Sequence, residues 1–176
     1  MKNKKLTGNL AASLALVSGS IWLGAYILRM FISYRLFDID MNLIGNLNTA
    51  NLEGFLFAFT PAVNTTFITY IIFVLSFSIF LFTSKMILKE NGWLFIITLI
   101  VYITLPFEVY LMTIDYKMIL GLNYSATVNA DYIISLIKDR FENLSSFPVI
   151  IILSYCSAYF FLIFKPLTQK KNLKKH

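Results

Sequence analysis

The sequence predicts an all-α integral membrane protein, a four-helix bundle with an amphipathic helix capping its outer side. Of its 176 residues, 58% are hydrophobic and only 14% are charged, whereas a soluble domain carries about 25% charged residues. Four stretches also lack charge over the roughly 20 residues that a helix needs to cross a membrane. Because no polar linker or internal repeat divides the chain, we expect one transmembrane domain over residues 1–176.

The membrane-spanning helices are expected at about residues 8–36, 61–85, 92–116 and 147–165. In lipid the backbone polar groups have no water to bond, so apolar runs of this length form helices. Thr60 and Pro61 suit the N-cap and first position of the second helix. We expect residues 38–60, before that start, to form a short interfacial or re-entrant piece.

The first apolar run shares some features with a cleaved signal peptide. It has a basic start, and Ser18 and Ser20 are placed as a cleavage site requires. However, the run continues to Leu28, which is longer than the apolar region of an ordinary signal peptide. We therefore expect this segment to stay in the protein as a transmembrane helix.

The distribution of basic residues predicts the orientation. Ten of the fifteen lie on one side of the predicted bundle: Lys2, Lys4, Lys5, Lys85, Lys89, Lys165, Lys170, Lys171, Lys174 and Lys175. The other side holds Arg29, Arg35, Lys117, Lys138 and Arg140 with eight of the nine acidic residues. Since Lys and Arg accumulate in cytoplasmic loops, both termini are predicted inside.

The net charge of +6 does not indicate nucleic-acid binding. The lysines flank long apolar runs, where they suit contact with anionic lipid headgroups. The composition, rich in Ile, Asn, Lys and Phe, is typical of a bacterial protein. We therefore predict the cell membrane, specifically the bacterial inner membrane, as the location.

Residues 129–144 have the pattern of an amphipathic helix on the outer surface. One predicted face carries Tyr132, Ile133, Leu136, Ile137, Phe141 and Leu144. The opposite face carries Asp131, Lys138, Asp139 and Glu142. The pattern leaves two interpretations open, a packed loop helix or a functional lid over the mouth of the bundle.

Cofactor ligands are scarce in this sequence. The single histidine is His176, in the basic tail, and the single cysteine is Cys156. A bis-histidine haem, a zinc site or a Ser-His-Asp triad in the membrane would need ligands that these residues cannot supply. The seven glycines form no phosphate-binding loop. We therefore predict no metal and no cofactor.

Three charged residues near the outer helix ends stand out. A charge at the membrane centre costs about 2.5–3.5 kcal/mol on insertion scales, so such residues usually face the bundle interior and pair. The rise of an α-helix puts Arg29 between Glu108 and Asp115 in depth, and the two carboxylates share one face. An Arg29–Glu108 ion pair is one interpretation. The other is that Arg29 reaches the headgroups while water wets Glu108.

Small residues mark the first helix as the central packing helix. Ala11, Ala15 and Gly19 follow one another at four-residue spacing, and Ser20 and Gly24 form a neighbouring stripe. Small side chains let membrane helices approach closely, so all five are predicted at helix contacts.

The leading functional interpretation is a non-catalytic accessory or scaffolding subunit of a larger membrane assembly. Its expected partners are the lipid bilayer and other membrane subunits or copies of itself. The first alternative is a small transporter or ligand-binding protein, with an outward polar pocket of Arg29, Asn64, Glu108 and Asp115 beneath residues 129–144. A carboxylate-dependent membrane enzyme ranks last, because Glu108 and Asp115 are separated by ~10 Å along the helix.

Overall fold

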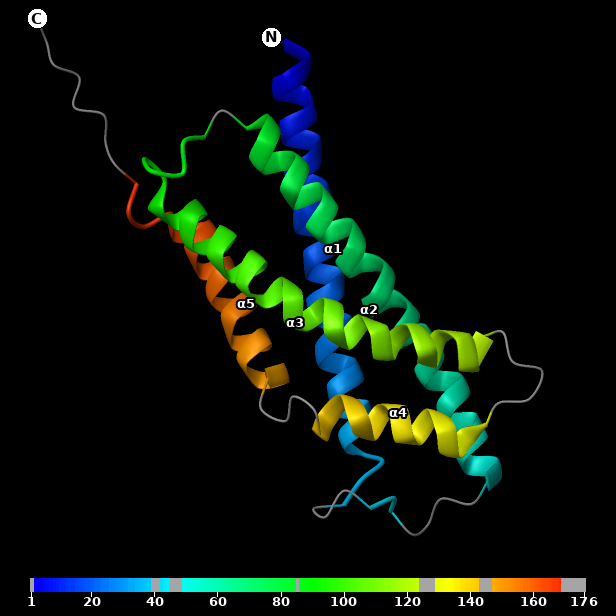
Figure 1. Cartoon of the computed structure of the whole chain (residues 1–176). Helices are drawn as coiled ribbons and strands as arrows, with labels where there is room; N and C mark the ends of the chain where they lie inside the picture. Colours follow the sequence, from blue (N-terminus) through cyan, green and yellow to red (C-terminus); the bar gives the residue numbers. More distant parts are fainter. Residues whose placement is uncertain are drawn as a thin grey trace, which may run out of the picture.

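The computed structural model describes residues 2–38, 42–44, 49–84, 86–123, 129–142 and 147–168. Apart from two isolated β-bridges, the regular structure of these residues is helical, which confirms the predicted all-α class. Their helices are α1 (Lys2–Tyr34), α2 (Thr49–Thr83), α3 (Gly92–Asn123), α4 (Ala130–Glu142) and α5 (Phe147–Phe164) (Figure 1).

Four of these helices are long and apolar enough to cross a membrane. The spans are Leu6–Tyr34, Gly54–Thr83, Gly92–Asn123 and Phe147–Phe164. The remaining helix, α4, is short and amphipathic, and it buries one face against α3 and α2. The predicted membrane bundle with an amphipathic cap is therefore confirmed.

The predicted start of the second helix was wrong. α2 begins at Thr49, so part of the segment expected to be re-entrant is helical and Pro61 lies inside the helix. A proline inside a helix costs about 3 kcal/mol. Here an apolar face continues across it, because Leu56, Phe59 and Val63 are each at most 1% exposed. Burial of this face offsets the penalty.

The predicted end of the third helix was also too early. α3 continues to Asn123 because α4 packs along its last turns. Met118 is fully buried there, and Gly121 lies so close to α4 that an added Cβ would be 2.6 Å from Ile133 Cδ1. The sequence suggested the cap but not the length of helix it covers.

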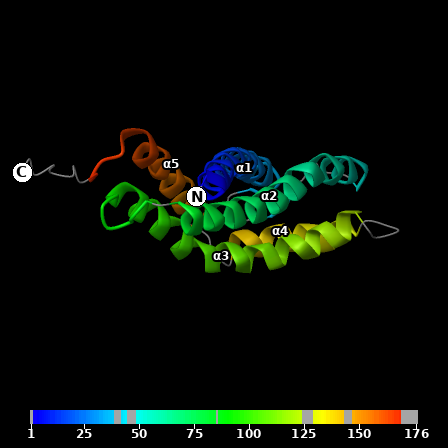
Figure 2. The same cartoon turned by 90° about the horizontal axis from the view of Figure 1, so that it is seen from above.

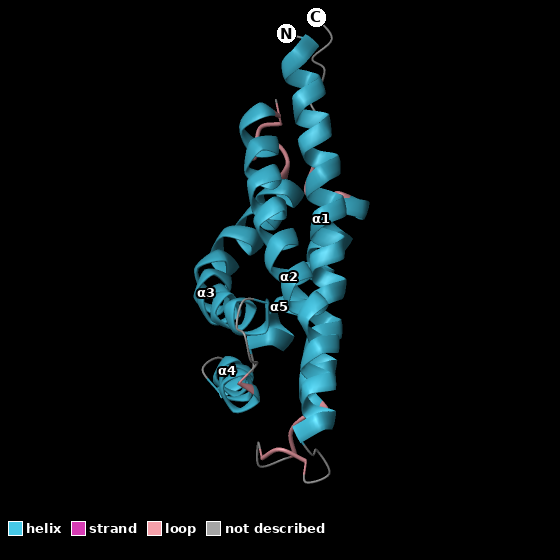
Figure 3. Ribbon diagram, turned by 90° about the vertical axis from the view of Figure 1, so that its right-hand side faces the viewer, coloured by secondary structure: helices cyan, strands magenta, loops and turns pink. Residues whose placement is uncertain are grey.

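The four spans form two ends that differ in charge. α1 and α2 pack along one another, α3 runs beside α2, and α5 packs mainly on α3 (Figures 1 and 2). The start of α3 lies beside the segment after α5, since Gly92 N–H donates to Leu167 O over 3.2 Å. We call this end, which carries Lys89 and Lys165, the lysine-rich end. The opposite end, where α4 lies beneath α3 (Figure 3), is the α4 end.

Two apolar clusters fill the interior, one toward each end. The cluster nearer the lysine-rich end is built around Trp22, Phe73 and Trp93. The cluster at the α4 end includes Phe59 and Ile137 and joins α4 to the other helices. Arg29, Glu108 and Asp115 lie where these two clusters meet.

The small residues of α1 have different surroundings. Ala11, Ala15 and Gly19 are buried, and a Cβ on Gly19 would be 2.9 Å from the Phe73 ring. Ser20 is exposed, but its hydroxyl lies 2.8 Å from Tyr159 Oη of α5. Gly24 has open space where a side chain would lie, so the structure gives it no close helix contact.

The two ends allow a direct test of the predicted orientation. In a Cys156→Ser background, single cysteines replace Asn42 and Asn129 at the α4 end and Lys89 at the lysine-rich end, all of them exposed positions. With both termini inside, a membrane-impermeant maleimide should label positions 42 and 129 in intact cells. Position 89 should react only after permeabilisation. Labelling of position 89 in intact cells would contradict the orientation.

Candidate functional site

Asp115 of α3 binds Arg29 of α1 through a bidentate ion pair. Arg29 Nη1 donates to Asp115 Oδ2 over 2.8 Å, and Nη2 donates to Oδ1 over 2.5 Å. The side chains are 4% and 2% exposed, so water screens this pair very little. Arg29 also lies over the Phe59 ring, 5.7 Å from its centroid. The pair ties α1 to α3 inside the bundle.

A second arginine reaches the same carboxylate from α4. Arg140 Nη1 lies 3.0 Å from both oxygens of Asp115 and also donates to Leu111 O over 3.2 Å. The helix periodicity explains this position, because Ile133, Ile137 and Arg140 share the buried face of α4. Arg140 was not among the residues that the sequence predicted for the site. Its spacing of three and seven residues from those isoleucines was the signal that could have found it.

The hydrogen-bonding sites of the Asp115 carboxylate are all occupied. A carboxylate offers about four lone-pair sites, and the two arginines occupy all four. A carboxylate held in this way is a poor general base, so the arrangement does not favour the enzyme alternative. Two guanidinium groups on one carboxylate also leave an excess of positive charge, which the nearby Glu108 can balance.

Glu108 lies two helical turns before Asp115 and is 2% exposed. It interacts electrostatically with Arg140, Asp115 and Arg29, and its side chain approaches that of Tyr26. The structure therefore brings together three of the four predicted pocket residues, but Arg29 pairs with Asp115 rather than with Glu108. Packing sets the height of α1 relative to α3, and this height puts Arg29 level with the later carboxylate.

Asn64, the fourth predicted pocket residue, has a different neighbour. It is half-buried on α2, and its side-chain oxygen accepts a bond from Asn123 Nδ2 over 3.2 Å. This contact joins α2 to the end of α3 at the α4 end. Among the residues that the structure describes, Asn64 forms no hydrogen bond or ion pair with Arg29, Glu108 or Asp115.

Beside the charges is a group of buried polar atoms that lack a well-formed hydrogen bond. These atoms are Glu108 Oε1, Trp22 Nε1, Tyr26 Oη and Tyr70 Oη, although the Tyr26 side chain lies near Glu108 and Arg140 and that of Tyr70 lies near Tyr155. The Trp22 ring centroid lies 5.4 Å from that of Tyr26, 5.0 Å from Tyr70 and 4.7 Å from Tyr155. Glu108 interacts electrostatically with all three tyrosines. We call Trp22, Tyr26, Tyr70, Glu108 and Tyr155 the polar layer.

The polar layer carries a cost that packing alone does not explain. Each buried polar group without a partner costs about 1–3 kcal/mol, and native proteins contain few of them. Tyr155 Oη is satisfied, because it bonds Thr104 Oγ1 over 3.0 Å. The other four groups are left with free bonding capacity in one region, which is the usual property of a place that holds water or a ligand.

Arg29, Asp115 and Arg140, which we call the charge cluster, have little free space around them. A cavity of about 20 Å³ is lined by Tyr26, Arg29, Arg140, Phe141 and other residues. A single water needs at least about 10–15 Å³, so the cavity admits one water and nothing larger. α4 forms one wall of this cavity through Arg140 and Phe141.

Among the described residues, no three His, Cys, Asp or Glu side chains gather in a way that could hold a metal ion. The chain matches no protein-family model, no curated protein and no solved structure.

Proposed function

We propose that this protein is a non-catalytic membrane protein that binds a small polar solute in its interior, as a transporter or a receptor does. The observation that carries this proposal is the polar layer, in which four polar atoms of one buried region lack a well-formed hydrogen bond. Ionisable groups inside a membrane commonly mark solute pathways. The lysine distribution and the composition support a bacterial inner membrane as the location.

The polar layer defines the chemistry of the solute. The indole Nε1 of Trp22 can only donate, tyrosine hydroxyls donate or accept, and an ionised Glu108 only accepts. A fitting solute therefore carries both a hydrogen-bond acceptor and a donor. Its size is small, because the site is enclosed by the aromatic rings of Trp22, Tyr26, Tyr70 and Tyr155.

α4 serves as the lid in this proposal, which is one of the two interpretations of the amphipathic helix. It lies beneath α3 at the α4 end of the bundle (Figure 3) and contributes Arg140 to the charge cluster. Moving α4 away would break the bonds of Arg140 to Asp115 and Leu111. The solute would then enter from the side that the lysine distribution predicts to be outside.

Purified protein tests the proposal in a thermal-shift screen against small neutral, zwitterionic, anionic and cationic solutes. We expect one class to raise the Tm. Glu108→Gln and Tyr70→Phe should each weaken the binding of that class by about 10–100-fold, because a hydrogen bond to a charged group contributes about 1.5–3 kcal/mol. The matched controls Glu142→Gln and Tyr116→Phe change exposed residues and should bind normally.

Two results would contradict the proposal. One is that no solute class raises the Tm of protein that circular dichroism shows to be folded. The other is a shift that Glu108→Gln and Glu142→Gln reduce equally, because the solute would then bind outside the polar layer.

An accessory or scaffolding role in a larger assembly is a second proposal, supported by α5. Only 17% of its span is buried within the protein, compared with 39% for α1. Phe160, Ile163 and Phe164 are more than half exposed and could pack on another membrane protein. A stable oligomer or a co-purifying subunit on blue-native electrophoresis would support this role, and a lone monomer would contradict it.

A further inference from the structure

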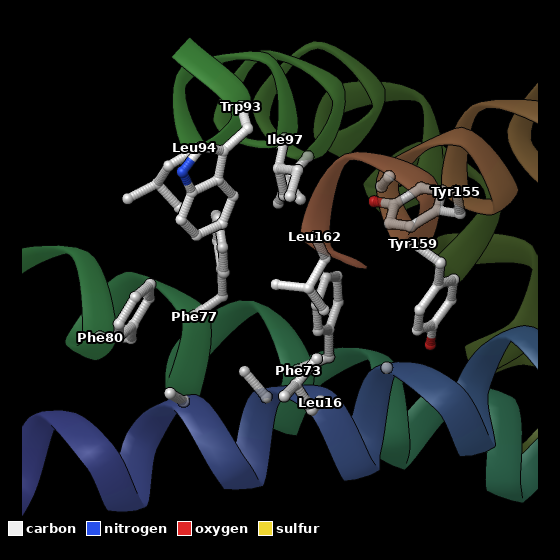
Figure 4. Close-up of a pocket in the computed structure, with 15 residues that line it drawn as sticks. Leu16, Phe73, Phe77, Phe80, Trp93, Leu94, Ile97, Tyr155, Tyr159 and Leu162 are labelled. Carbon is white, nitrogen blue, oxygen red and sulfur yellow. The ribbon is translucent and has the colours of Figure 1, made fainter. Parts of the chain in front are cut away.

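A second internal space lies in the half of the bundle nearer the lysine-rich end. It is a cavity of about 110 Å³ between α1, α2, α3 and α5 (Figure 4). Its walls include Phe77, Trp93 and Leu162, and their apolar surface dominates the lining. Ala15 and Ala158 also line it, and their small side chains leave the space unfilled. Tyr155 of the polar layer also lines the cavity, at the end away from the lysines, whereas Arg29, Asp115 and Arg140 do not line it.

The cavity approaches the surface at the seam between α1 and α5. These two helices contact one another far less than α1 and α2 do. Leu16, on the α1 side of the seam, is 44% exposed, and Leu162 on the α5 side is partly exposed. Farther from the lysine-rich end, the bond between Ser20 and Tyr159 closes the seam. The opening therefore faces the lipid tails of the surrounding membrane.

A positive charge lies just beyond the cavity. Lys165 follows directly after α5, and its Nζ lies 5.7 Å from the ring centroid of Trp93, which lines the cavity. Lys165 is seven residues beyond Ala158, or ~10 Å along a helix. The exposed Lys89 lies in the turn before α3 at the same end. A phosphate group at Lys165 would thus place an acyl chain beside the cavity.

We propose that this cavity binds part of an acyl chain of an anionic phospholipid, whose phosphate group contacts Lys165. The size fits, because cavities of about 150 Å³ hold a benzene ring, so 110 Å³ holds a short stretch of chain. A helix from a partner is about 10 Å wide and needs a long open groove. The lysines add a preference for negative headgroups, to which each basic residue near the surface contributes about five-fold.

Tryptophan quenching by brominated lipid tests the site. The chain has two tryptophans, so Trp22→Phe leaves Trp93 as the sole fluorophore. In phosphatidylcholine vesicles, a small fraction of phosphatidylglycerol with brominated chains should quench Trp93 several-fold more than the same fraction of brominated phosphatidylcholine. Ala158→Leu, which fills the cavity, should reduce quenching to the level of bulk lipid. Lys165→Gln should lower the preference for phosphatidylglycerol about five-fold, and the matched control Lys117→Gln should not.

Three results of the quenching experiment would overturn the proposed lipid site. Equal quenching by the two lipids, or quenching that Ala158→Leu leaves unchanged, would overturn it. A cavity protected from brominated lipid in a protein that is dimeric in detergent would also overturn it, because a second copy would then cover the seam. If Trp22→Phe does not fold, the same comparison in the natural chain decides, since Trp22 is fully buried and contributes a constant background.

Discussion

Asp115→Asn should lower the free energy of unfolding by about 3–5 kcal/mol, the loss seen when one partner of a buried ion pair is removed. Asparagine keeps the shape of the side chain but loses its charge, and it has one acceptor oxygen where the carboxylate has two. Arg29 and Arg140 are 3% and 8% exposed, so neither charge gains much from water. Two guanidinium groups would then face one another without a carboxylate between them.

Reversible unfolding in mixed micelles measures this loss. The matched control is Asp139→Asn on α4, which makes the same change at an exposed position and should stay within about 0.5 kcal/mol of the natural protein. Equal stability of the two variants would show that the charge cluster contributes little to the fold. In that case the apolar face of α4 would be what holds it on the bundle.

The four spans could be predicted because an apolar run of sufficient length has few structures open to it in lipid. Boundaries were harder, as Pro61 shows. A proline after a threonine is typical of a helix start, but here a buried face on both sides of it keeps the helix continuous. That face packs against α3 and α4, and no local sequence pattern reports those contacts.

The site was only partly predictable for the same reason. Charges within apolar runs identified Arg29, Glu108 and Asp115, because the cost of burying a charge does not depend on the details of the fold. Which carboxylate meets Arg29 depends on how far α1 is shifted along α3. The position of α1 is fixed by tertiary packing, such as that of the Trp22 ring on side chains of α2 and α5.

The polar layer could not have been predicted from the sequence. Trp22, Tyr70 and Tyr155 lie on three different helices, and tyrosine or tryptophan in a membrane helix is equally common where it faces lipid headgroups. Only the assembled bundle shows that Trp22 Nε1 and Tyr70 Oη are buried without a well-formed hydrogen bond in the region of Glu108, beside Tyr155, whose hydroxyl bonds Thr104. Arg140 is the opposite case, because its place on the apolar face of an amphipathic helix is visible in the sequence alone.

The triple variant Arg29→Met, Asp115→Leu, Arg140→Met should recover most of the stability that Asp115→Asn loses. Buried ion pairs replaced together by apolar side chains of similar volume often leave a protein as stable as before or more stable. Leucine and methionine would extend the apolar cluster around Phe59 and Ile137. Glu108 would lose both cationic neighbours, and it can take up a proton instead of remaining as an unpaired charge. We expect the triple variant within about 2 kcal/mol of the natural protein.

The test compares the triple variant with the three single variants Arg29→Met, Asp115→Leu and Arg140→Met. Residues in one ion-pair network show strong coupling, so the sum of the single losses should exceed the loss in the triple variant by several kcal/mol. Losses that simply add would mean that the arginines act independently of Asp115. The triple variant can also be tested with the solute that stabilises the natural protein. If coupling is found and this solute no longer raises the Tm of the variant, the charges are needed for binding rather than for folding. A folded triple variant that still binds the solute would limit the charge cluster to holding α4 in place.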